Sequence, residues 1–353
     1  MPINDARAPH VLIQADGSPV GGVVAAHVSS TNHFGADRFR VTISPLGGAP
    51  ELAYWADATD LDMQIAVEIG GSPSLLIDGL IDQVGIDPIA GLVHLDGRDR
   101  TALLIEARTQ ETFANNTASE IAVILAGRHG LGASVVPTAT PVGRYWELEH
   151  DRITLNQFCR ASTEWDLLVA LAQREDYDVW VRGTTLYFQP PQTPPMIGAV
   201  LRPVATLAGP ATVETLRLER SLTLAQDIEI VVKSWNSKLG RSFQQTARAT
   251  HNRPGSSRVQ RYTYVIPDLT PDVALKLAQQ RLLELTVHER VVMAEMPGDA
   301  LLDARTMVRV EGTASGFDQD YVIDSIERTL DIRGFRQHLR ARNMSPGVQV
   351  QAV

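Results

Sequence analysis

The segment Met63–Ile86 reads MQIAVEIGGSPSLLIDGLIDQVGI. Its first half alternates apolar and polar side chains, which is typical of a strand with one buried and one solvated face. The apolar positions of that half are Met63, Ile65, Val67 and Ile69. The turn 70–73 contains two glycines and a proline, and a second long strand is expected from Leu75 to Ile86. The segment therefore predicts a β-hairpin.

The same alternation continues toward the N-terminus. Phe39, Val41 and Ile43 alternate with polar side chains, and residues 11 to about 98 read as a string of strands. Several successive hairpins whose strands each bury one face indicate a barrel or a sandwich. We therefore expect a β domain in the first hundred residues.

After Thr109 the apolar period becomes that of a helix. Thr117 and Glu120 have the spacing of a capping box, so a short amphipathic helix is expected to begin there. Gly127 and Gly130 predict where that helix ends.

A longer helix is expected to begin after Thr154, with Gln157 as its capping-box partner, and to run to about Asp176. Residues 177–188 then predict a second hairpin. The stretch 189–195 has four prolines in seven positions, and proline continues neither a helix nor a central strand. We expect a linker or a domain boundary there.

Strand alternation returns after this proline-rich stretch. It is visible in residues 228–232, 307–311 and 335–342. One helix interrupts the strands, with Thr270 as its N-cap and Pro271 at its first position. A second β domain with one helix is therefore expected.

Together these patterns predict a mainly β chain with an α+β insert, in which two antiparallel β-barrel-like domains flank a small α/β region. The expected division is a first β-barrel domain over residues 1–108, an α+β insert over 109–189, a Pro-rich linker over 190–202, a second β-barrel domain over 203–343 with one helix at 271–286, and a C-terminal arm over 344–353.

Bulk composition excludes several classes of protein. The formal net charge is -9, so general binding to nucleic acid through phosphate neutralisation is not expected. One cysteine, Cys159, excludes an internal disulfide and reads as a buried small apolar residue. The N-terminus lacks the apolar core of a signal peptide, and no run approaches the ~20 apolar residues of a membrane span. We expect synthesis in a cytoplasm and no membrane anchor.

The segments 63–87 and 307–331 have a similar form. Each is an alternating strand, a glycine-containing turn and a strand, with Ile77-Asp78-Gly79-Leu80 in the first and Ile323-Asp324-Ser325-Ile326 in the second. Two interpretations stay open. Either the β domains are copies of one barrel, or the two hairpins resemble each other only because few residue types are suited to tight turns.

Three phrases occur in an order that resembles the phage late control gene D proteins, the baseplate hubs of contractile-tailed phages. They are Leu95–Asp99 at the end of the first β domain, Asn116–Ala122 at the start of the short helix, and Gly312–Ile323 near the end. These hubs are similar in their core to the VgrG proteins of type VI secretion. The resemblance covers most of the chain, and none of the phrases is a catalytic signature.

The resemblance implies a homotrimeric ring in the virion, at the tail tip or baseplate. In such a ring, two barrel domains per chain adapt a sixfold tube to a threefold spike, and the tape-measure protein and DNA pass through. The implied partners are further copies of the chain, the tail tube protein, the spike protein and the tape-measure protein. Nothing after Asn343 resembles a spike, so a separate spike protein is expected.

Enzyme signatures give no catalytic, cofactor or metal site, so we expect no enzymatic activity and no cofactor. The nine histidines are scattered, without the i, i+4 pair of a zincin helix. Gly312–Gly316 places its serine one position late for a nucleophile elbow, which favours a hairpin turn. Asp96–Asp99 is interpreted as a turn with an Asp–Arg pair. Alternation places Asp78 and Asp82 on one exposed strand face, which disfavours a glycosidase pair.

Assembly of a ring buries apolar and aromatic surface. The candidate interface residues are Trp55, Tyr145, Trp146 and Trp235, each of which could equally belong to a core. The sequence therefore predicts a structural tail-tip hub. Two alternatives remain, a tail-associated cell-wall hydrolase and a receptor-binding module.

Overall fold

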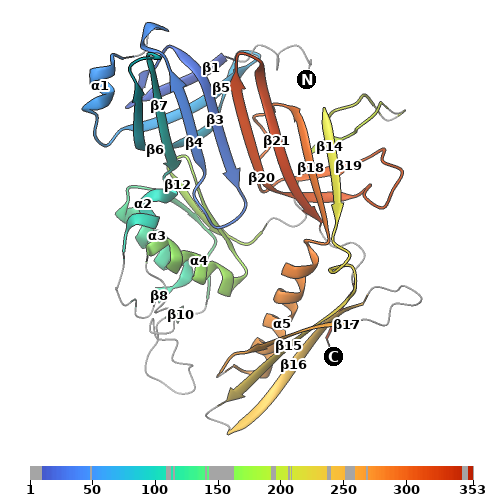
Figure 1. Cartoon of the computed structure of the whole chain (residues 1–353). Coiled ribbons are helices and arrows are strands. Elements are labelled where there is room, and N and C mark those ends of the chain that lie inside the picture. Colours follow the sequence, from blue (N-terminus) through green and yellow to red (C-terminus); the bar gives the residue numbers. More distant parts are fainter. Residues whose placement is uncertain are drawn as a thin grey trace. The chain divides into compact units, whose positions relative to one another are not determined.

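The computed structural model describes residues 10–47, 50–108, 113, 116–139, 141–142, 163–191, 196–205, 207, 209–236, 240–250, 259–267, 269–343 and 349–352. The chain folds into two compact units (Figure 1). Unit 1 comprises residues 1–196, 296–306 and 325–338, and unit 2 comprises the remaining residues. Each unit is built from several segments of the sequence.

Unit 1 is built on a strongly bent antiparallel sheet. Its strand order is β2-β1-β5-β6-β7-β4-β3, and β3 pairs next with residues 325–330 of β20. The strands are β1 (His10–Ala15), β2 (Ser18–Pro19), β3 (Val23–Thr31), β4 (Arg38–Ile43), β5 (Asp62–Ile69), β6 (Ser72–Asp87), β7 (Leu92–Asp99) and β20 (Asp320–Asp331). β6 joins the two parts of this sheet, because its first half pairs with β5 and its second half with β7.

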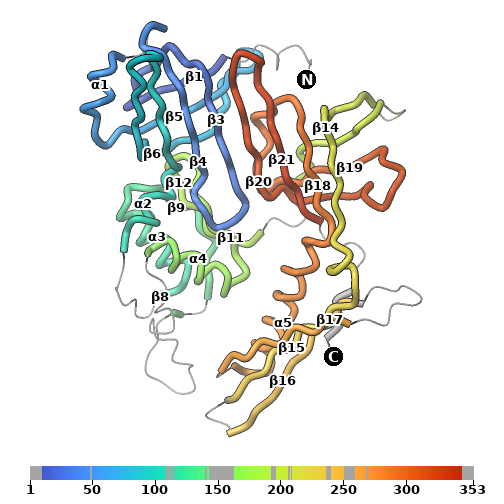
Figure 2. The backbone as a smooth tube through the Cα atoms, viewed as in Figure 1, coloured from blue at the N-terminus to red at the C-terminus, as the bar shows by residue number. Residues whose placement is uncertain are grey.

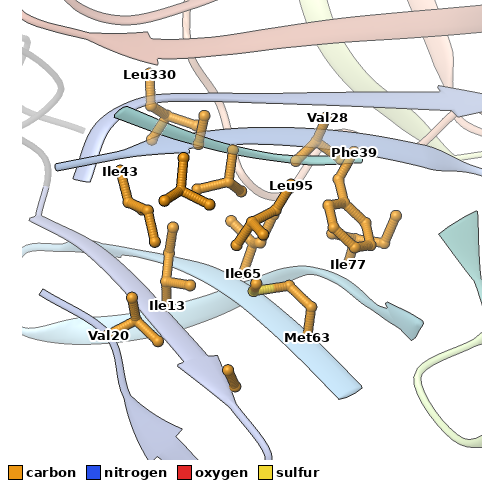
Figure 3. Packing of buried hydrophobic residues seen from close by; sticks show 14 of the residues in the cluster. Ile13, Val20, Val28, Phe39, Ile43, Met63, Ile65, Ile77, Leu95 and Leu330 are labelled. Carbon is orange, nitrogen blue, oxygen red and sulfur yellow. The ribbon is translucent and has the colours of Figure 1, made fainter. Parts of the chain in front are cut away.

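The predicted alternation defines the core of this sheet. Phe39, Val41 and Ile43 are buried along β4, and the four apolar positions of the first quoted strand fall in β5. Figure 3 shows Phe39 and Ile43 of β4 pointing to the same interior as Met63 and Ile65 of β5. The hairpin between β5 and β6 turns at Gly70-Gly71, as the sequence predicts.

Neighbouring atoms lie so close to the backbone at two positions of this sheet that only glycine fits there. A Cβ on Gly97 would clash with the Phe39 ring and the Leu80 carbonyl oxygen, and one on Gly79 would clash with the Arg98 carbonyl. The pairing of β6 with β7 shifts register between Ile81 and Gln83 at the same level. A bulge and two glycines therefore allow the strong bend.

In its described residues, the α+β part of unit 1 has three helices and a small three-stranded sheet. The helices are α2 (Thr101–Glu106), α3 (Ala118–Arg128) and α4 (Glu164–Glu175). The sheet has the order β11-β12-β9, formed by β11 (Asp178–Arg182), β12 (Thr185–Gln189) and β9 (Gly132–Val135). Short β8 (Asn116–Thr117) pairs with β10 (Pro141–Val142). A second apolar cluster, distinct from the barrel core, holds these elements together.

The caps of the helices decide where they begin. Thr117 caps α3 and forms the predicted capping box with Glu120, which confirms that helix. α4 begins at Glu164, and its N-cap is Thr163, with Asp166 as capping-box partner. The start predicted after Thr154 lies outside the described residues, as does Cys159. The short helices α1 (Leu52–Ala56) and α2 were not predicted, because neither has a side-chain cap.

Unit 2 contains a strand-rich part and a sheet covered by one helix. The first is formed by β13 (Ile197–Leu201), β14 (Thr215–Arg220), β18 (Arg290–Pro297), β19 (Met307–Val310), the first residues of β20 and the end of β21 (Gly334–Asn343). β14 pairs with β18, and β19 pairs with both β13 and β20. Phe335, Gln337, Leu339 and Ala341 are buried at alternate positions of β21, as predicted.

The helix-covered sheet of unit 2 has the order β17-β15-β16-β22. Its strands are β15 (Asp227–Asn236), β16 (Arg241–Thr250), β17 (Val259–Val265) and β22 (Gln349–Ala352). α5 (Pro271–Thr286) begins at the predicted Thr270 cap and packs on β15 and β16 (Figure 2). Residues 349–352 of the expected C-terminal arm form an edge strand on β16.

The fold is mainly β with multiple antiparallel sheets, which confirms the predicted class. Parallel pairing also occurs, between β9 and β12, between β13 and β19, and between β15 and β17. Among the described residues, no helix has the length and apolar character needed to span a membrane.

Candidate functional site

The four predicted interface residues lie in different settings. Trp55 is buried in unit 1, where its indole Nε1 donates a hydrogen bond to the Pro50 carbonyl oxygen at 3.2 Å. Tyr145 and Trp146 lie outside the described residues. Trp235, on β15 of unit 2, is 54% exposed. Trp235 is therefore the described candidate whose side chain is available for contact.

The charged motif Asp96–Asp99 lies on strand β7, so its interpretation as a turn is wrong. Its side chains pair across strands instead. Asp96 accepts a hydrogen bond from Arg40 Nε of β4 at 2.6 Å. Arg98 donates two hydrogen bonds to Asp82 of β6, at 2.6 and 2.7 Å, and also contacts Glu106. The motif therefore supplies matched charges to the outer face of the sheet.

The solvated side of the unit 1 sheet forms a groove of about 480 Å³, which we call the polar groove. The residues that line it are His27, Val28, Ser29, Arg38, Phe39, Arg40, Asp82, Gln83, Asp96, Gly97, Arg98, Glu327, Arg328 and Thr329. His27 Nδ1 and Thr329 Oγ1 are also hydrogen-bonded across it, at 3.1 Å. Rows of cross-strand partners give the polar groove a nearly balanced mixture of positive and negative charge.

Asp78 is buried, with 4% of its surface exposed, so its predicted place on an exposed face is wrong. Its carboxylate accepts hydrogen bonds from Arg100 Nε and from Gln64 Nε2, each at 2.7 Å. Asp82 is one-third exposed and pairs with Arg98. The bulge between Ile81 and Gln83 breaks the alternation on which the prediction rested.

Two further acids lie where β4 begins and β7 ends: Asp37, directly before β4, is half-buried, and Asp99, the last residue of β7, is buried. Burial raises the pKa of Asp99 to about 8, and the nearby Asp37 charge raises it further; the Asp99 carboxylate accepts a hydrogen bond from Thr101 N at 3.1 Å. Burial also raises the pKa of Asp37 to about 6, against a hydrogen bond from Thr31 N at 2.9 Å. These carboxyl groups therefore titrate near neutral pH.

Arginines accompany these acids. Burial lowers the pKa of both Arg305 and Arg328, and neighbouring acids oppose that shift. Arg305 lies over the Trp180 ring, 4.6 Å from its centroid, and Trp180 stacks on Tyr187 at 4.9 Å. Arg328 contacts the carbonyl oxygen of Leu302. These contacts tie residues 296–306 to β11 and to the barrel of unit 1.

The helix-covered sheet of unit 2 carries a second charged surface. Glu229 of β15 lies directly between Arg248 of β16 and Arg261 of β17. It is 7% exposed, and Arg261 donates to both of its oxygens at 3.0 to 3.2 Å. Arg248 is farther away, at 3.5 Å. We call this side of the sheet the outer face; it consists of Asp227, Glu229, Val231, Lys233, Trp235, Ser242, Gln244, Thr246, Arg248, Val259, Arg261, Thr263 and Val265.

In the part of the chain that the structure describes, we find neither a metal-binding cluster nor a nucleophile elbow. No group of three or more His, Cys, Asp or Glu side chains there is arranged to hold a metal ion. Gly312–Gly316 lies in the connection between β19 and β20, which pair antiparallel, and this confirms the hairpin interpretation. Thr313 there donates its amide and hydroxyl to Asp318 at 3.0 and 2.6 Å.

Comparison with solved structures places this fold among phage tail proteins. The tail protein from Neisseria meningitidis MC58 has a TM-score of 0.71 at 16% identity, over 96% of this chain and 98% of that chain. The 43 kDa tail protein of prophage MuSo2 from Shewanella oneidensis has a TM-score of 0.68 at 17% identity, over 97% and 98%. No protein-family model and no curated protein gives a significant match to the sequence.

A type VI secretion component from E. coli, described as structurally similar to the T4 bacteriophage tail proteins gp27 and gp5, also shares the fold. Its TM-score is 0.54 at 12% identity, over 93% of this chain and 76% of that chain. The chain therefore has a fold found in phage tail and type VI secretion proteins. Membership of the late control gene D family stays a prediction.

Proposed function

We propose that the chain is a structural protein of a phage tail or a related contractile injection machine, located in the virion at the tail tip or baseplate, and that it has no enzymatic activity. The observation that carries this proposal is the likeness to two tail proteins over nearly the whole of each chain. A likeness of that extent includes both units and the α+β part, and not one common domain alone.

Within the tail, the proposed role is that of a homotrimeric hub that joins the sixfold tube to the threefold spike. Two matching ion pairs support the idea of a repeated domain. Asp78 of the first similar segment pairs with Arg100, and the equally buried Asp324 of the second pairs with Arg342 at 3.0 Å. Two repeats in each of three chains would offer six similar contacts to a sixfold tube. The five-segment domain division remains part of this proposal.

A hub must also let the tape-measure protein and DNA pass. The polar groove is suited to a wall of such a passage, because its cross-strand charges neutralise one another and leave little net attraction for a polyanion. Tape measure, tube and spike proteins are the partners proposed for the ring.

Light scattering combined with co-purification tests this function. A hub is expected to be a trimer and to bind tube or spike protein encoded beside it. A monomer that binds neither contradicts the hub proposal. Clearing of peptidoglycan in a zymogram would instead support the hydrolase alternative, and retention on host cell-wall material would support a receptor-binding module.

A further inference from the structure

Charge is distributed unevenly along this acidic chain. Residues 1–196 contain 24 acidic and 12 basic side chains, whereas residues 227–287 contain nine basic and five acidic ones. All three lysines of the chain, Lys233, Lys238 and Lys276, lie in the second segment. That segment holds β15, β16, β17 and α5. The helix-covered sheet of unit 2 is therefore basic within a chain of net charge -9.

The outer face concentrates part of this positive charge. α5 buries the opposite face, through Ile228, Ile230 and Val232 of β15. Alternation then directs Lys233, Arg248 and Arg261 to the outer face, together with the acidic residues Asp227 and Glu229. Three cations against two carboxylates, of which Glu229 is buried, leave the outer face with net positive charge.

Exposed apolar groups lie among these cations. Trp235 is 54% exposed and Val265 is 76% exposed. Trp235 and Lys233 lie on the same side of β15, two residues apart. Tryptophan and arginine beside exposed aliphatic side chains are the composition that protein interfaces favour.

The complementary composition occurs on unit 1. Residues 41–97 contain nine acidic side chains and neither lysine nor arginine. Around helix α1, Glu51, Asp57 and Asp60 are exposed, and Tyr54 beside them is 44% exposed. This surface, which we call the α1 surface, offers carboxylates and an aromatic ring to a cationic partner.

We propose that the outer face of unit 2 in one copy of the chain docks on the α1 surface of unit 1 in a second copy. The inference rests on the proposed ring. Two different patches that complement each other make a head-to-tail contact, and such contacts close into rings when the rotation permits. A second copy is the partner favoured by the complementary charges of the two surfaces.

Charge reversal with a matched control tests the contact. Lys233→Glu changes the outer face, and Lys276→Glu makes the same change on α5, at an exposed position of the opposite side. We expect Lys233→Glu to weaken trimer association at least about tenfold in analytical ultracentrifugation, and Lys276→Glu to have little effect. Association of the wild-type chain should weaken as salt rises. Thermal melting of each variant confirms that it is folded.

A charge swap then identifies the partner surface. Adding Asp57→Lys to Lys233→Glu is expected to restore association, and Trp235→Phe should remove a fluorescence blue shift that accompanies assembly. A salt-insensitive trimer in which Lys233→Glu matches Lys276→Glu overturns the inference and leaves the hub proposal standing. Failure of the swap to restore a weakened trimer overturns the α1 surface as the partner.

Two other outcomes separate this inference from the proposed function. A wild-type chain that is monomeric at every salt concentration overturns the ring and, with it, this contact. Binding of a labelled DNA duplex, measured by fluorescence anisotropy and abolished by Lys233→Glu alone, would assign the outer face to nucleic acid and overturn docking between copies.

Discussion

The polar groove of unit 1 and the outer face of unit 2 are both the solvated sides of sheets whose other sides are buried, yet their charges are organised differently. In the polar groove Arg40 of β4 and Arg98 of β7 each meet a carboxylate on a neighbouring strand, Asp96 and Asp82. On the outer face, two arginines share the single Glu229.

The difference teaches that cross-strand register decides whether a charged sheet face is neutral or carries excess charge. Both faces obey the same alternation, and both place ions directly opposite one another. A sheet face with balanced charges does not attract a charged partner, whereas a face with excess charge attracts a partner of opposite charge.

Asp78→Ala should cost the most, because it leaves Arg100 largely buried and without its closest carboxylate. Breaking a buried ion pair typically costs several kcal/mol, and we expect a loss of about 3 kcal/mol in the free energy of unfolding, since Asp62 still contacts Arg100. Urea denaturation measures it. Asp82→Ala, which breaks the partly exposed pair with Arg98, is the control and should cost below about 1 kcal/mol. Equal losses would contradict the assigned burial.

Asp99→Asn should change how stability depends on pH. The folded-state pKa of Asp99 is raised to about 8, so the folded chain holds a proton that the unfolded chain releases, and stability falls as pH rises toward 8. The slope contributed is at most about 1.4 kcal/mol per pH unit. The asparagine variant should lose the decline between pH 6 and 8, and below about 6 its decline should be shallower than that of the wild type, because Asp37 alone then contributes. Unfolding followed from pH 5 to 9 distinguishes them.

Glu229→Gln should make the outer face of unit 2 more positive and slightly destabilise it. Without the carboxylate charge, Arg248 and Arg261 repel each other, and a loss of about 1 kcal/mol in unfolding free energy is expected because both guanidinium groups reach solvent. The outer face gains positive charge, so association between copies at low salt should strengthen. Weaker association in a folded variant would argue against electrostatic docking.

Trp235→Ala should have the smallest effect on the folded chain. Its side chain is 54% exposed, and substitutions at such positions usually change stability by less than about 0.5 kcal/mol. Trp55→Ala is the buried counterpart, with an expected loss of about 3 kcal/mol or more. A comparable melting temperature for the two variants would show that Trp235 is part of a core.

Strand identity and helix caps were predictable because they depend on neighbours in sequence. The β5–β6 hairpin, the Thr117 capping box and the Thr270–Pro271 start follow from local spacing. The burial of Asp78 was not predictable, because the side chains that contact its carboxylate, Gln64 and Arg100, lie 14 and 22 residues away in the sequence. The hairpin alternation was still sufficient to place the buried side of β5.

The charged surfaces needed knowledge of which strands are neighbours. β15 pairs in parallel with β17, so Glu229 meets Arg261 only because these two strands, which β16 separates in the sequence, are neighbours in the sheet. Trp235 could be named from residue type alone, whereas its exposure required the fold. Pairing between distant strands is therefore the part of the site that spacing cannot supply.

Strands β20 and β21 divide their residues between the two units, and the chain passes from one unit to the other five times. During synthesis, the edge of β3 stays unpaired until residues 325–330 have been made. Most of unit 2 has been synthesised by then. Such late, long-range pairing slows folding and leaves a strand edge open to neighbours in the interval. No single cleavage point yields either unit whole, so limited proteolysis should release fragments that stay associated.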